Sequence, residues 1–598
     1  MGGESSPVEE VERLLQRGDP LLAYDRACHA DSAALDAVDG ARLGYLRALA
    51  LARSGATERA AVELAGLVVS DAAMPADLVE DTAALHARLS KDRALAMDPS
   101  TQREGFARAA EQYEAVFRHY GRPYSAVNAA TMRFLAGNRD EARTLAEATL
   151  ALLGDDGPTD DYWRAASRAE AHLALGDLDV AARWLEIADR TAPDEYGDRS
   201  TTLKQLRLLC AAQGLSDDLL GPLGNPDVVH YCGHRISPPG GSGQFPSDDE
   251  ARVAAEIQQA LAARRVGWGH GSLAAGADVI VAEALLAIGA ELHVALPFSV
   301  EEFVETSVRP SGDQWVSRFQ RCLEAASSVV VTCDSAYMGD DALYGYAGMI
   351  SMGQALNRSH SLSSPVWQLA VWDGNPTGLP AGTAHDVSVW SGAGGTSHVV
   401  SVGGPPRIVP APPPADVVVQ RRPVRAVLFG DLRGFSSLRD EHLTHFIDGV
   451  LPILAEVLDR HDSVLDRNTW GDGLFVALRD AASAAECALD LQHALDGIDM
   501  EGLGLPQMQM RLSAHAGPVL AGTDPIRGVS TVFGRELTRG ARIEPLTPPG
   551  AVYASAAFAS LLRVAPGAGV VPEYVGRITT AKDFETVPMY VLRRQQSS

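Results

Sequence analysis

The chain has 598 residues, more than one hydrophobic core usually holds, so we expect about two to four domains. Apolar residues make up 46% and charged residues 21%, as in ordinary soluble proteins, and six scattered cysteines without a CxxC pair argue against a disulfide framework or a zinc site. The net charge of −26 argues against a surface for nucleic acid or anionic membranes, and no apolar run approaches the ~20 residues of a membrane span, so we expect a cytoplasmic protein.

Residues 7–221 are rich in alanine and leucine at helical spacing and have almost no strand signal. A pattern of small residues around a glycine recurs at three places: Ala48, Gly55 and Ala60; Ala130, Gly137 and Ala142; Ala169, Gly176, Ala181, Ala188 and Pro193. Small residues allow paired helices to approach, and the glycine closes the turn between them. The spacing resembles a degenerate tetratricopeptide solenoid, which implies an all-α repeat domain that binds a protein partner. The alternative is an irregular helical bundle.

Residues 225–400 alternate between strand and helix patterns. The segments 228–231, ELHVALPF, SVVVTCD and PVWQLAVWDG predict strands, and helical patterns lie between them. About five parallel strands joined by crossover helices predict a Rossmann-like α/β domain.

Ligands of such sheets bind at the carboxyl ends of the strands. Those ends carry Gly233 and Arg235, a glycine-rich loop (269–278) with Gly271 and Gly276, and Asp334. Glycines let main-chain amides approach a phosphate, and the next helix adds its positive N-terminal end. The loop resembles those of nucleotide-sensing SLOG-like domains, which implies a small nucleotide ligand. The alternative is a scaffold in which the glycines only make turns.

Two further features surround this domain. Glu283 lies one turn into the helix after the loop, and it is a candidate catalytic acid for an enzyme that cleaves NAD or a nucleotide. Its alternative is a plain surface acid. The segment 401–423 contains PAPPPA, which forms neither a helix nor a strand ladder, and therefore predicts a semi-stiff linker.

Two aspartates mark residues 424–598. Asp431 follows an apolar run in AVLFGDLRGFSSL, and Asp472 lies in a GDG turn within NTWGDGLFVAL. Two carboxylates on neighbouring strand ends can hold divalent cations through hard oxygen ligands, as phosphoryl chemistry requires. The alternative is that one acid caps a helix and the other is only a turn residue.

The C-terminal segment as a whole resembles the class III nucleotide cyclase catalytic domain, which implies an α+β ferredoxin-like fold. Besides the two aspartate motifs, the segments RLSAHAGPVLAG, TVFGRELTRGARIEPLTPPGAVYAS and KDFETVPMYVL match the family in the same order. The resemblance implies that a nucleoside triphosphate is converted to its 3′,5′-cyclic monophosphate and pyrophosphate, with two Mg²⁺ or Mn²⁺ ions at a site shared by a homodimer.

The resemblance also implies roles for single residues. Asp431, Asp472 and the main-chain carbonyl of Leu432 would hold the metals. Asn468 and Thr531 would contact the base, and Lys582 and, more loosely, Arg527 would contact the phosphates. Thr538 and Arg542 would face the transition state. The expected substrate is ATP, under control of the N-terminal modules.

Two departures leave alternatives open. Asn468 stands where the adenylate pattern has a lysine, and an asparagine offers both a donor and an acceptor, so a pyrimidine (UTP or CTP) cyclase of an anti-phage system is an alternative. Thr538 stands where the family has asparagine, so a catalytically weak cyclase fold that senses a nucleotide or NAD through the middle domain is another. We expect Trp470 in the core rather than stacked on a base.

Overall fold

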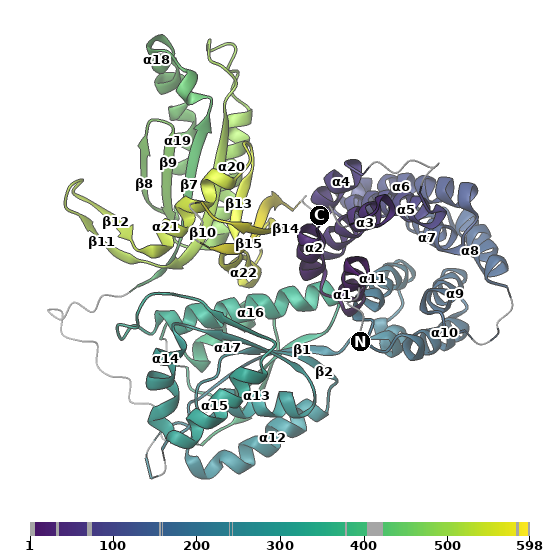
Figure 1. Cartoon of the computed structure of the whole chain (residues 1–598), viewed down its shortest axis with the longest axis horizontal. Coiled ribbons are helices and arrows are strands. Elements are labelled where there is room, and N and C mark those ends of the chain that lie inside the picture. Colours follow the sequence, from purple (N-terminus) through teal and green to yellow (C-terminus); the bar gives the residue numbers. More distant parts are fainter. Residues whose placement is uncertain are drawn as a thin grey trace.

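A computed structural model describes the chain in three parts (Figure 1). The described residues are 6–31, 35–67, 74–154, 157, 159–238, 240–241, 243–376, 379–403, 422–581 and 585–595. Lys582 and most of the expected linker, residues 404–421, lie outside them. A curved array of helices comes first, then an α/β unit, and then a second unit with its own sheet.

The first part consists of helices of which the first ten pack against their neighbours in chain order, whereas the eleventh packs against the first, seventh and ninth. They are α1 (Pro7–Arg17), α2 (Pro20–His29), α3 (Ala37–Ser54), α4 (Thr57–Ala65), α5 (Ala76–Leu95), α6 (Pro99–Tyr120), α7 (Pro123–Ala136), α8 (Arg139–Leu153), α9 (Tyr162–Leu175), α10 (Leu178–Thr191) and α11 (Tyr196–Gln213). Figure 1 shows that this array curves around its own interior, as a solenoid does.

The glycines and small residues of the repeats act as expected. Gly55, Gly137 and Gly176 end α3, α7 and α9 with φ values of 89°, 94° and 90°, the left-handed conformation that glycine adopts without strain. The alanines of the pattern are buried: Ala48, Ala60, Ala130, Ala142, Ala169, Ala181 and Ala188. The helix pairs therefore approach through the small side chains that the sequence repeats.

The second part is a parallel sheet with the strand order β4-β3-β2-β1-β5-β6. Its strands are β1 (Asp227–Gly233), β2 (Val266–Gly271), β3 (Glu291–Leu296), β4 (Ser328–Val331), β5 (Val366–Trp372) and β6 (Ser397–Ser401). Its helices are α12 (Glu250–Ala262), α13 (Ala277–Ala287), α14 (Val300–Phe303), α15 (Asp313–Ala325), α16 (Ala342–Leu362) and α17 (Thr383–Gly392). α12, α13 and α15 share one apolar core with the strands, and α16 covers the opposite face.

Two details differ from expectation. The first residues of the expected glycine-rich loop form β2, because Gly269 and Gly271 allow Leu285 and Tyr231 to pack directly on the strand. β6 extends the sheet at its edge to Ser401, one residue into the segment expected to be linker.

The third part has a seven-stranded mixed sheet with the order β14-β15-β13-β10-β7-β9-β8, and a separate arm made of β11 and β12. Its strands are β7 (Val424–Arg433), β8 (Val464–Trp470), β9 (Gly473–Leu478), β10 (Gln509–Pro518), β11 (Leu520–Asp524), β12 (Val529–Phe533), β13 (Val552–Ser555), β14 (Val570–Thr579) and β15 (Thr586–Arg594). Its helices are α18 (Asp440–Gly449), α19 (Leu451–Asp459), α20 (Ala481–Asp496), α21 (Arg535–Ile543) and α22 (Ala556–Val564).

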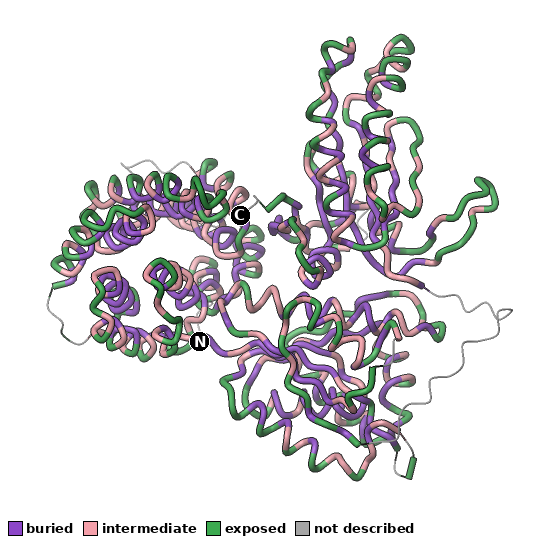
Figure 2. The backbone as a smooth tube through the Cα atoms, turned by 180° about the vertical axis from the view of Figure 1, so that it is seen from behind, coloured by how far each residue is buried: buried purple, intermediate pink, exposed green. Residues whose placement is uncertain are grey.

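Helix α16 belongs to two cores at once. Ala355 and Leu362 pack beneath β1 and β2, whereas Tyr346 and Ile350 join the core of the third part. The Tyr346 hydroxyl donates a hydrogen bond to the Ala516 carbonyl at 2.9 Å. Figure 2 shows buried residues running along the strands of both sheets, on either side of this helix. Within the described part of the chain, no helix combines the length and the apolar character needed to cross a membrane.

Candidate active site

Asp431 and Asp472 lie at the same end of neighbouring strands. Asp431 is near the end of β7, opposite Gly473 of β9 and Arg511 of β10. Asp472 lies in the turn between β8 and β9, where Gly471 has a φ of 74°, and the Leu432 amide donates to the Asp472 carbonyl at 3.2 Å. Both side chains are partly exposed. The turn thus presents its carboxylate beside the one that ends β7.

Arg511 joins Asp431 to a third acid, Glu544. Its guanidinium donates to the Asp431 carboxylate from both Nε, at 3.1 Å, and Nη2. The same Nε lies 3.1 Å from Glu544 Oε1. Burial raises the pKa of Glu544, and the charges of Asp431 and Asp472 raise it further against the attraction of Arg511. Three carboxylates therefore share one cation, which leaves this end of the sheet negative.

This arrangement fits a divalent cation. Asp431 and Asp472 offer hard oxygen ligands, and an added positive charge would relieve the repulsion felt at Glu544. Among the described residues, no group of three His, Cys, Asp or Glu side chains is arranged to hold a metal ion. A cation here would need further oxygen ligands, and the Leu432 carbonyl is of a suitable type.

The other residues expected at this site lie on elements around it. Thr538 is exposed on α21, and Arg542 lies one turn later on the same helix and is partly buried. Gly540 lets α21 lie close to the sheet, because a Cβ there would meet the Phe429 ring at 3.1 Å. Asn468 lies on β8, ahead of the Asp472 turn, and Thr531 lies on β12. Their roles stay predictions.

Two positions behave differently from expectation. Trp470 is 56% exposed, so the expectation that it lies in the core is wrong. Its indole rests on Gly473, where any side chain would collide with it. Arg527, at the tip of the β11–β12 arm, has its Nη1 3.6 Å from Asp466 Oδ2, so in this arrangement it is paired with a carboxylate.

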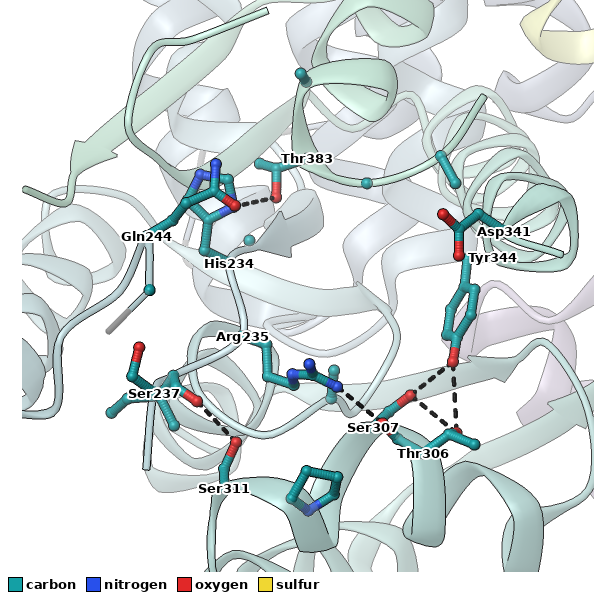
Figure 3. A pocket seen from close by; sticks show the side chains of 18 of the residues that line it. His234, Arg235, Ser237, Gln244, Thr306, Ser307, Ser311, Asp341, Tyr344 and Thr383 are labelled. Carbon is teal, nitrogen blue, oxygen red and sulfur yellow. Dashed lines mark hydrogen bonds between the residues drawn. The ribbon is translucent and has the colours of Figure 1, made fainter. Parts of the chain in front are cut away.

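A separate cavity of about 960 Å³ opens at the carboxyl end of β1, beside the start of α17 (Figure 3). Gly233 and Arg235, two of the residues expected at a ligand site, line it. Arg235 donates from Nη1 to the Thr306 carbonyl at 2.8 Å, and the Tyr344 hydroxyl lies 2.9 Å from Ser307 Oγ. Figure 3 shows these side chains around a common space.

The loop amides expected to bind a phosphate are occupied by the protein itself. The amide of Ala274 donates to Asp278 Oδ2 at 3.1 Å, and the amide of Ala275 donates to the Ser307 carbonyl at 3.0 Å. The amide of Ala277 donates to the His234 carbonyl at 3.3 Å. The carboxylate of Asp278 thus takes a place at the start of α13 that the sequence suggested for a phosphate.

A smaller cavity of about 130 Å³ lies behind this loop, and Gly271, Asp278, Ser351 and Asp386 line it. Burial raises the pKa of Asp278 to about 7, against the hydrogen bonds that it accepts from Ala274 and Gly233. Burial, and then the charge of Asp278, also raises the pKa of Asp386. This interior is rich in carboxyl groups and unfavourable for a phosphate.

Three further residues expected at the sheet edge have other neighbours. Gly276 has a φ of 104° and is packed against the main chain of Ile236, so it lines neither cavity. Asp334 forms an ion pair with Arg539 of α21, with Nη2 to Oδ2 at 2.5 Å. Glu283 accepts two hydrogen bonds from Arg318, at 2.6 and 2.9 Å, and also lies outside both cavities.

Arg511 and Glu544 were missed by the sequence reasoning. Arg511 opens the segment RLSAHAG, and its position opposite Asp431 depends on the antiparallel pairing of β7 with β10. Glu544 follows Arg542 by two residues, so it lies within a motif already quoted. The usable signal was an arginine at the start of the strand that pairs with the first aspartate strand.

Parts of the chain are similar to known proteins. Residues 23–133 match the sequence model of the Tetratricopeptide Repeats-Sensor family. The putative adenylate cyclase 3 of Rhizobium meliloti (strain 1021) is 32% identical over 144 residues, which are 23% of this chain and 22% of that protein. The chain therefore spans less than a quarter of that relative's length.

Solved structures give matches of similar extent. The adenylyl cyclase CyaB from P. aeruginosa is 19% identical, over 30% of this chain and 98% of that chain, with a TM-score of 0.27. The guanylate cyclase domain of RhGC from Catenaria anguillulae, in complex with GTP, is 15% identical, over 29% of this chain and 97% of that chain, with a TM-score of 0.26.

Proposed function

We propose that the protein is a nucleotide cyclase that converts a nucleoside triphosphate to its 3′,5′-cyclic monophosphate and pyrophosphate. The observation that carries the proposal is the meeting of Asp431 and Asp472 at one end of the sheet, with Arg511 holding Asp431 and Glu544. The partial match to a putative adenylate cyclase and the order of the sequence motifs support the same reaction.

The reaction places clear demands on the residues. The ribose 3′-oxygen attacks the α-phosphorus and loses its proton, while the bond from the α-phosphorus to the bridging oxygen breaks and pyrophosphate leaves. Two Mg²⁺ or Mn²⁺ ions would supply countercharge to the attacking oxygen and to the phosphates. Asp431 and Asp472 would bind them, and Arg542 would neutralise charge that grows on the α-phosphoryl oxygens.

A second copy of the chain would complete the site. The third part exposes large apolar side chains on α18, α19, β8 and the arm: Ile447, Ile453, Leu465, Trp470, Ile526, Val529 and Phe533. Ile526, at the tip of the arm, is 94% exposed. Apolar surface of this extent favours a partner, and a homodimer would bring the Thr538 and Arg542 of one copy to the metals of the other.

ATP is the substrate that we propose first. Asn468 supports a specific alternative, because its amide can both donate and accept, so it suits a pyrimidine edge as well as adenine. Thr538 is exposed and shorter than the asparagine of the family, which supports a slower reaction.

Control by the N-terminal modules is part of the proposal. The segment between β4 and α16 contacts the third part through Asp334, paired with Arg539. Its Asp340 carboxylate accepts from Arg422, two residues before β7, at 2.7 and 2.9 Å. Arg539 belongs to α21, the helix with Thr538 and Arg542. A ligand that preferred one arrangement of this segment would therefore change the catalytic helix.

Incubation of the purified full-length protein with ATP, GTP, CTP or UTP and Mn²⁺ tests the proposal. We expect cyclic AMP and pyrophosphate in equal amounts, and no product from Asp431→Asn protein. Product from UTP or CTP alone would replace ATP with a pyrimidine nucleotide. No product from any of the four, at saturating metal and with a demonstrated dimer, would contradict the activity.

A further inference from the structure

A second large cavity, of about 870 Å³, lies where the three parts of the chain meet. Residues of α3, α5 and α11 line it from the solenoid, residues 359–365 from the end of α16, and residues of β14 and β15 from the third part. This cavity shares no residue with the candidate sites described above, and it does not depend on the proposed cyclase reaction.

The charge of this cavity opposes the charge of the chain. Eight basic side chains line it, against three acidic ones, although the net charge of the protein is −26. The basic residues are Arg53, Arg88, Lys91, Arg93, Lys204, Arg207, Arg593 and Arg594, and the acidic ones are Glu58, Asp92 and Glu573. Two of the three lysines in the whole sequence are in this group. A local excess of cations in an acidic protein indicates a specific anion site.

Some of these cations have a structural partner. Arg93 binds Glu58 through two hydrogen bonds of 2.7 and 2.8 Å, and Arg593 donates to Glu573 at 2.9 Å. Arg53 lies 2.7 Å from Asp198, behind the cavity wall. Arg207 lies 3.4 Å from Asp217, and Arg594 pairs with Asp490. These five cations are paired and need no ligand.

The cations at the centre are not balanced in this way. Arg88 and Lys91 lie 3.7 and 3.8 Å from the carboxylate of Asp92, beyond hydrogen-bond distance, and Lys91 donates to Gln205 Oε1 at 3.2 Å. Lys204 donates to the Ser361 carbonyl at 3.2 Å, and among the described residues no carboxylate lies within ion-pair distance of it. Arg88 and Lys91 are only 9% and 8% exposed, and Arg88 Nε has no hydrogen-bond partner.

Burial and this unbalanced positive charge both lower the pKa of Lys204. Burial, followed by the charges of Arg88, Lys91 and Arg53 against that of Asp92, lowers the pKa of Lys204 to about 8. Burial also lowers the pKa of Lys91. Cations that lower one another's pKa in a cavity are stabilised when an anion enters, because it supplies the missing opposite charge.

We propose that this cavity binds a small molecule that carries two or more phosphate groups. A single carboxylate would leave most of the central charge unbalanced, whereas a phosphate chain can contact Arg88, Lys91 and Lys204 together, with an arginine fork for its oxygens. The cavity volume admits a small molecule, and the net negative charge of the protein disfavours a long polyanion such as a nucleic acid strand.

The position of the site gives the ligand a structural consequence. Lys204 and Ser200 donate to the Ser361 carbonyl, and Arg207 donates to the Ser363 carbonyl, so α11 already holds the end of α16 beside the cavity. A ligand bound by α5 and α11 would also lie against β15 of the third part. It would therefore fasten the solenoid to the two other parts.

Isothermal titration calorimetry of the full-length protein with inorganic tripolyphosphate, in EDTA and about 150 mM salt, tests the proposal. EDTA removes the metals that the proposed cyclase site would need. We expect one site, with at least about a tenfold increase in Kd for Lys204→Gln and for Arg88→Gln. Lys204→Arg keeps the charge and should bind as the wild type does. Arg118→Gln, on the exposed surface of α6, is the matched control and should change nothing.

A second calorimetric measurement determines the number of protons that the protein takes up on binding. At pH near 8 the bound phosphates should raise the pKa of Lys204, so binding should take up protons from the buffer, and this uptake should be lost in Lys204→Gln. ATP, GTP, CTP and UTP titrated in the same way identify the source: tighter binding of one nucleotide indicates a nucleotide ligand, and equal binding indicates that the phosphate chain suffices. Absence of binding, binding unchanged in both Gln variants, or binding of an acidic peptide but of no phosphate would overturn the proposal.

Discussion

The sheets of the second and third parts both have acids beside glycines at strand ends, yet they treat them in opposite ways. Asp431 and Asp472 remain partly exposed, and Asp431 shares Arg511 with Glu544. Asp278 is buried, and its carboxylate accepts a main-chain amide of its own loop. The same local pattern thus gives an open anionic site in one sheet and an internal helix cap in the other.

A position at a strand end therefore does not determine whether a polar group is available to bind a ligand. What decides is whether the group's hydrogen-bonding capacity is used inside the fold. The amides of Ala274, Ala275 and Ala277 all donate hydrogen bonds within the fold. At Asp472 the main-chain carbonyl accepts a hydrogen bond from β7, whereas the carboxylate is partly exposed.

The largest effect should come from Asp431→Asn and Asp472→Asn. Each change removes a charged oxygen ligand from the proposed two-metal site, so cyclase activity should fall by about 10³-fold or more, which is about 4 kcal/mol of barrier. The control is Asp278→Asn, which should leave activity within a few-fold. Initial rates of cyclic nucleotide formation measure both. Activity within tenfold of wild type for Asp431→Asn or Asp472→Asn would mean that this aspartate does not bind a catalytic metal, and the two sheets would then not differ in this respect.

Asp278→Asn should change stability in a pH-dependent way. The pKa of Asp278 is about 7 in the folded protein against an ordinary 3.8, so the folded state keeps this proton to higher pH than the unfolded state. Stability from this group is complete below pH 4 and is lost as the pH rises to about 7. The variant cannot ionise, so at pH 8 it should be more stable than wild type, by up to about 4 kcal/mol.

Denaturant unfolding at pH 5 and pH 8 measures this difference. The neighbouring carboxyl of Asp386 also has a raised pKa, so Asp386→Asn should show the same sign. A variant that is destabilised equally at both pH values would mean that Asp278 is charged in the folded protein and serves as an ionised helix cap.

Mixing two inactive proteins should restore part of the activity. If the site of the third part is shared between two copies, Asp431→Asn and Arg542→Ala proteins should complement, because one site of each hybrid dimer has both intact halves. With free exchange, half of the dimers are hybrids and half of their sites are intact, so about a quarter of wild-type activity is the maximum. The same mixture made from two Asp431→Asn preparations is the control. Failure to complement despite measured subunit exchange would mean that each chain carries a complete site.

The smallest effect should come from the contact between the two parts. Asp334→Asn removes the ion pair with Arg539. Because the Asp334 side chain is 41% exposed, the cost in unfolding free energy should stay below about 1 kcal/mol. Cyclase activity should nevertheless shift by about threefold, because Arg539 is on α21. Asp313→Asn, in an exposed pair with Arg309, is the control for loss of a surface charge. Equal activity of both variants and wild type would show that this contact transmits nothing.

Local patterns in the sequence predicted local structure well. The glycines that end α3, α7 and α9, and the turn that carries Asp472, follow from rules that operate within a few residues. The pairing of Arg511 with Asp431 depends on strand register across 80 residues, and no short motif contains it. Trp470 was misplaced because an apolar residue at a strand end was assumed to be core, although its side chain is 56% exposed at the end of β8.

The basic cavity could not be predicted from the sequence. Arg88 and Lys204 lie on helices separated by more than 100 residues, and Arg594 is at the opposite end of the sequence. Each of them looks like an ordinary solvated side chain when it is read alone. Only the curvature of the solenoid and the return of β15 to it bring these charges together.

Helix α16 has a consequence for how the molecule can be divided. Tyr346 and Ile350 belong to one core, and Ala355 and Leu362 belong to another. A domain boundary at 401–423 would therefore cut the chain between two sheets that still share the packing of α16. A fragment that starts at residue 424 would expose the apolar face of α22 that α16 covers in the intact chain. The two sheet units should therefore melt as one calorimetric transition, and a transplanted catalytic unit would need this helix to travel with it.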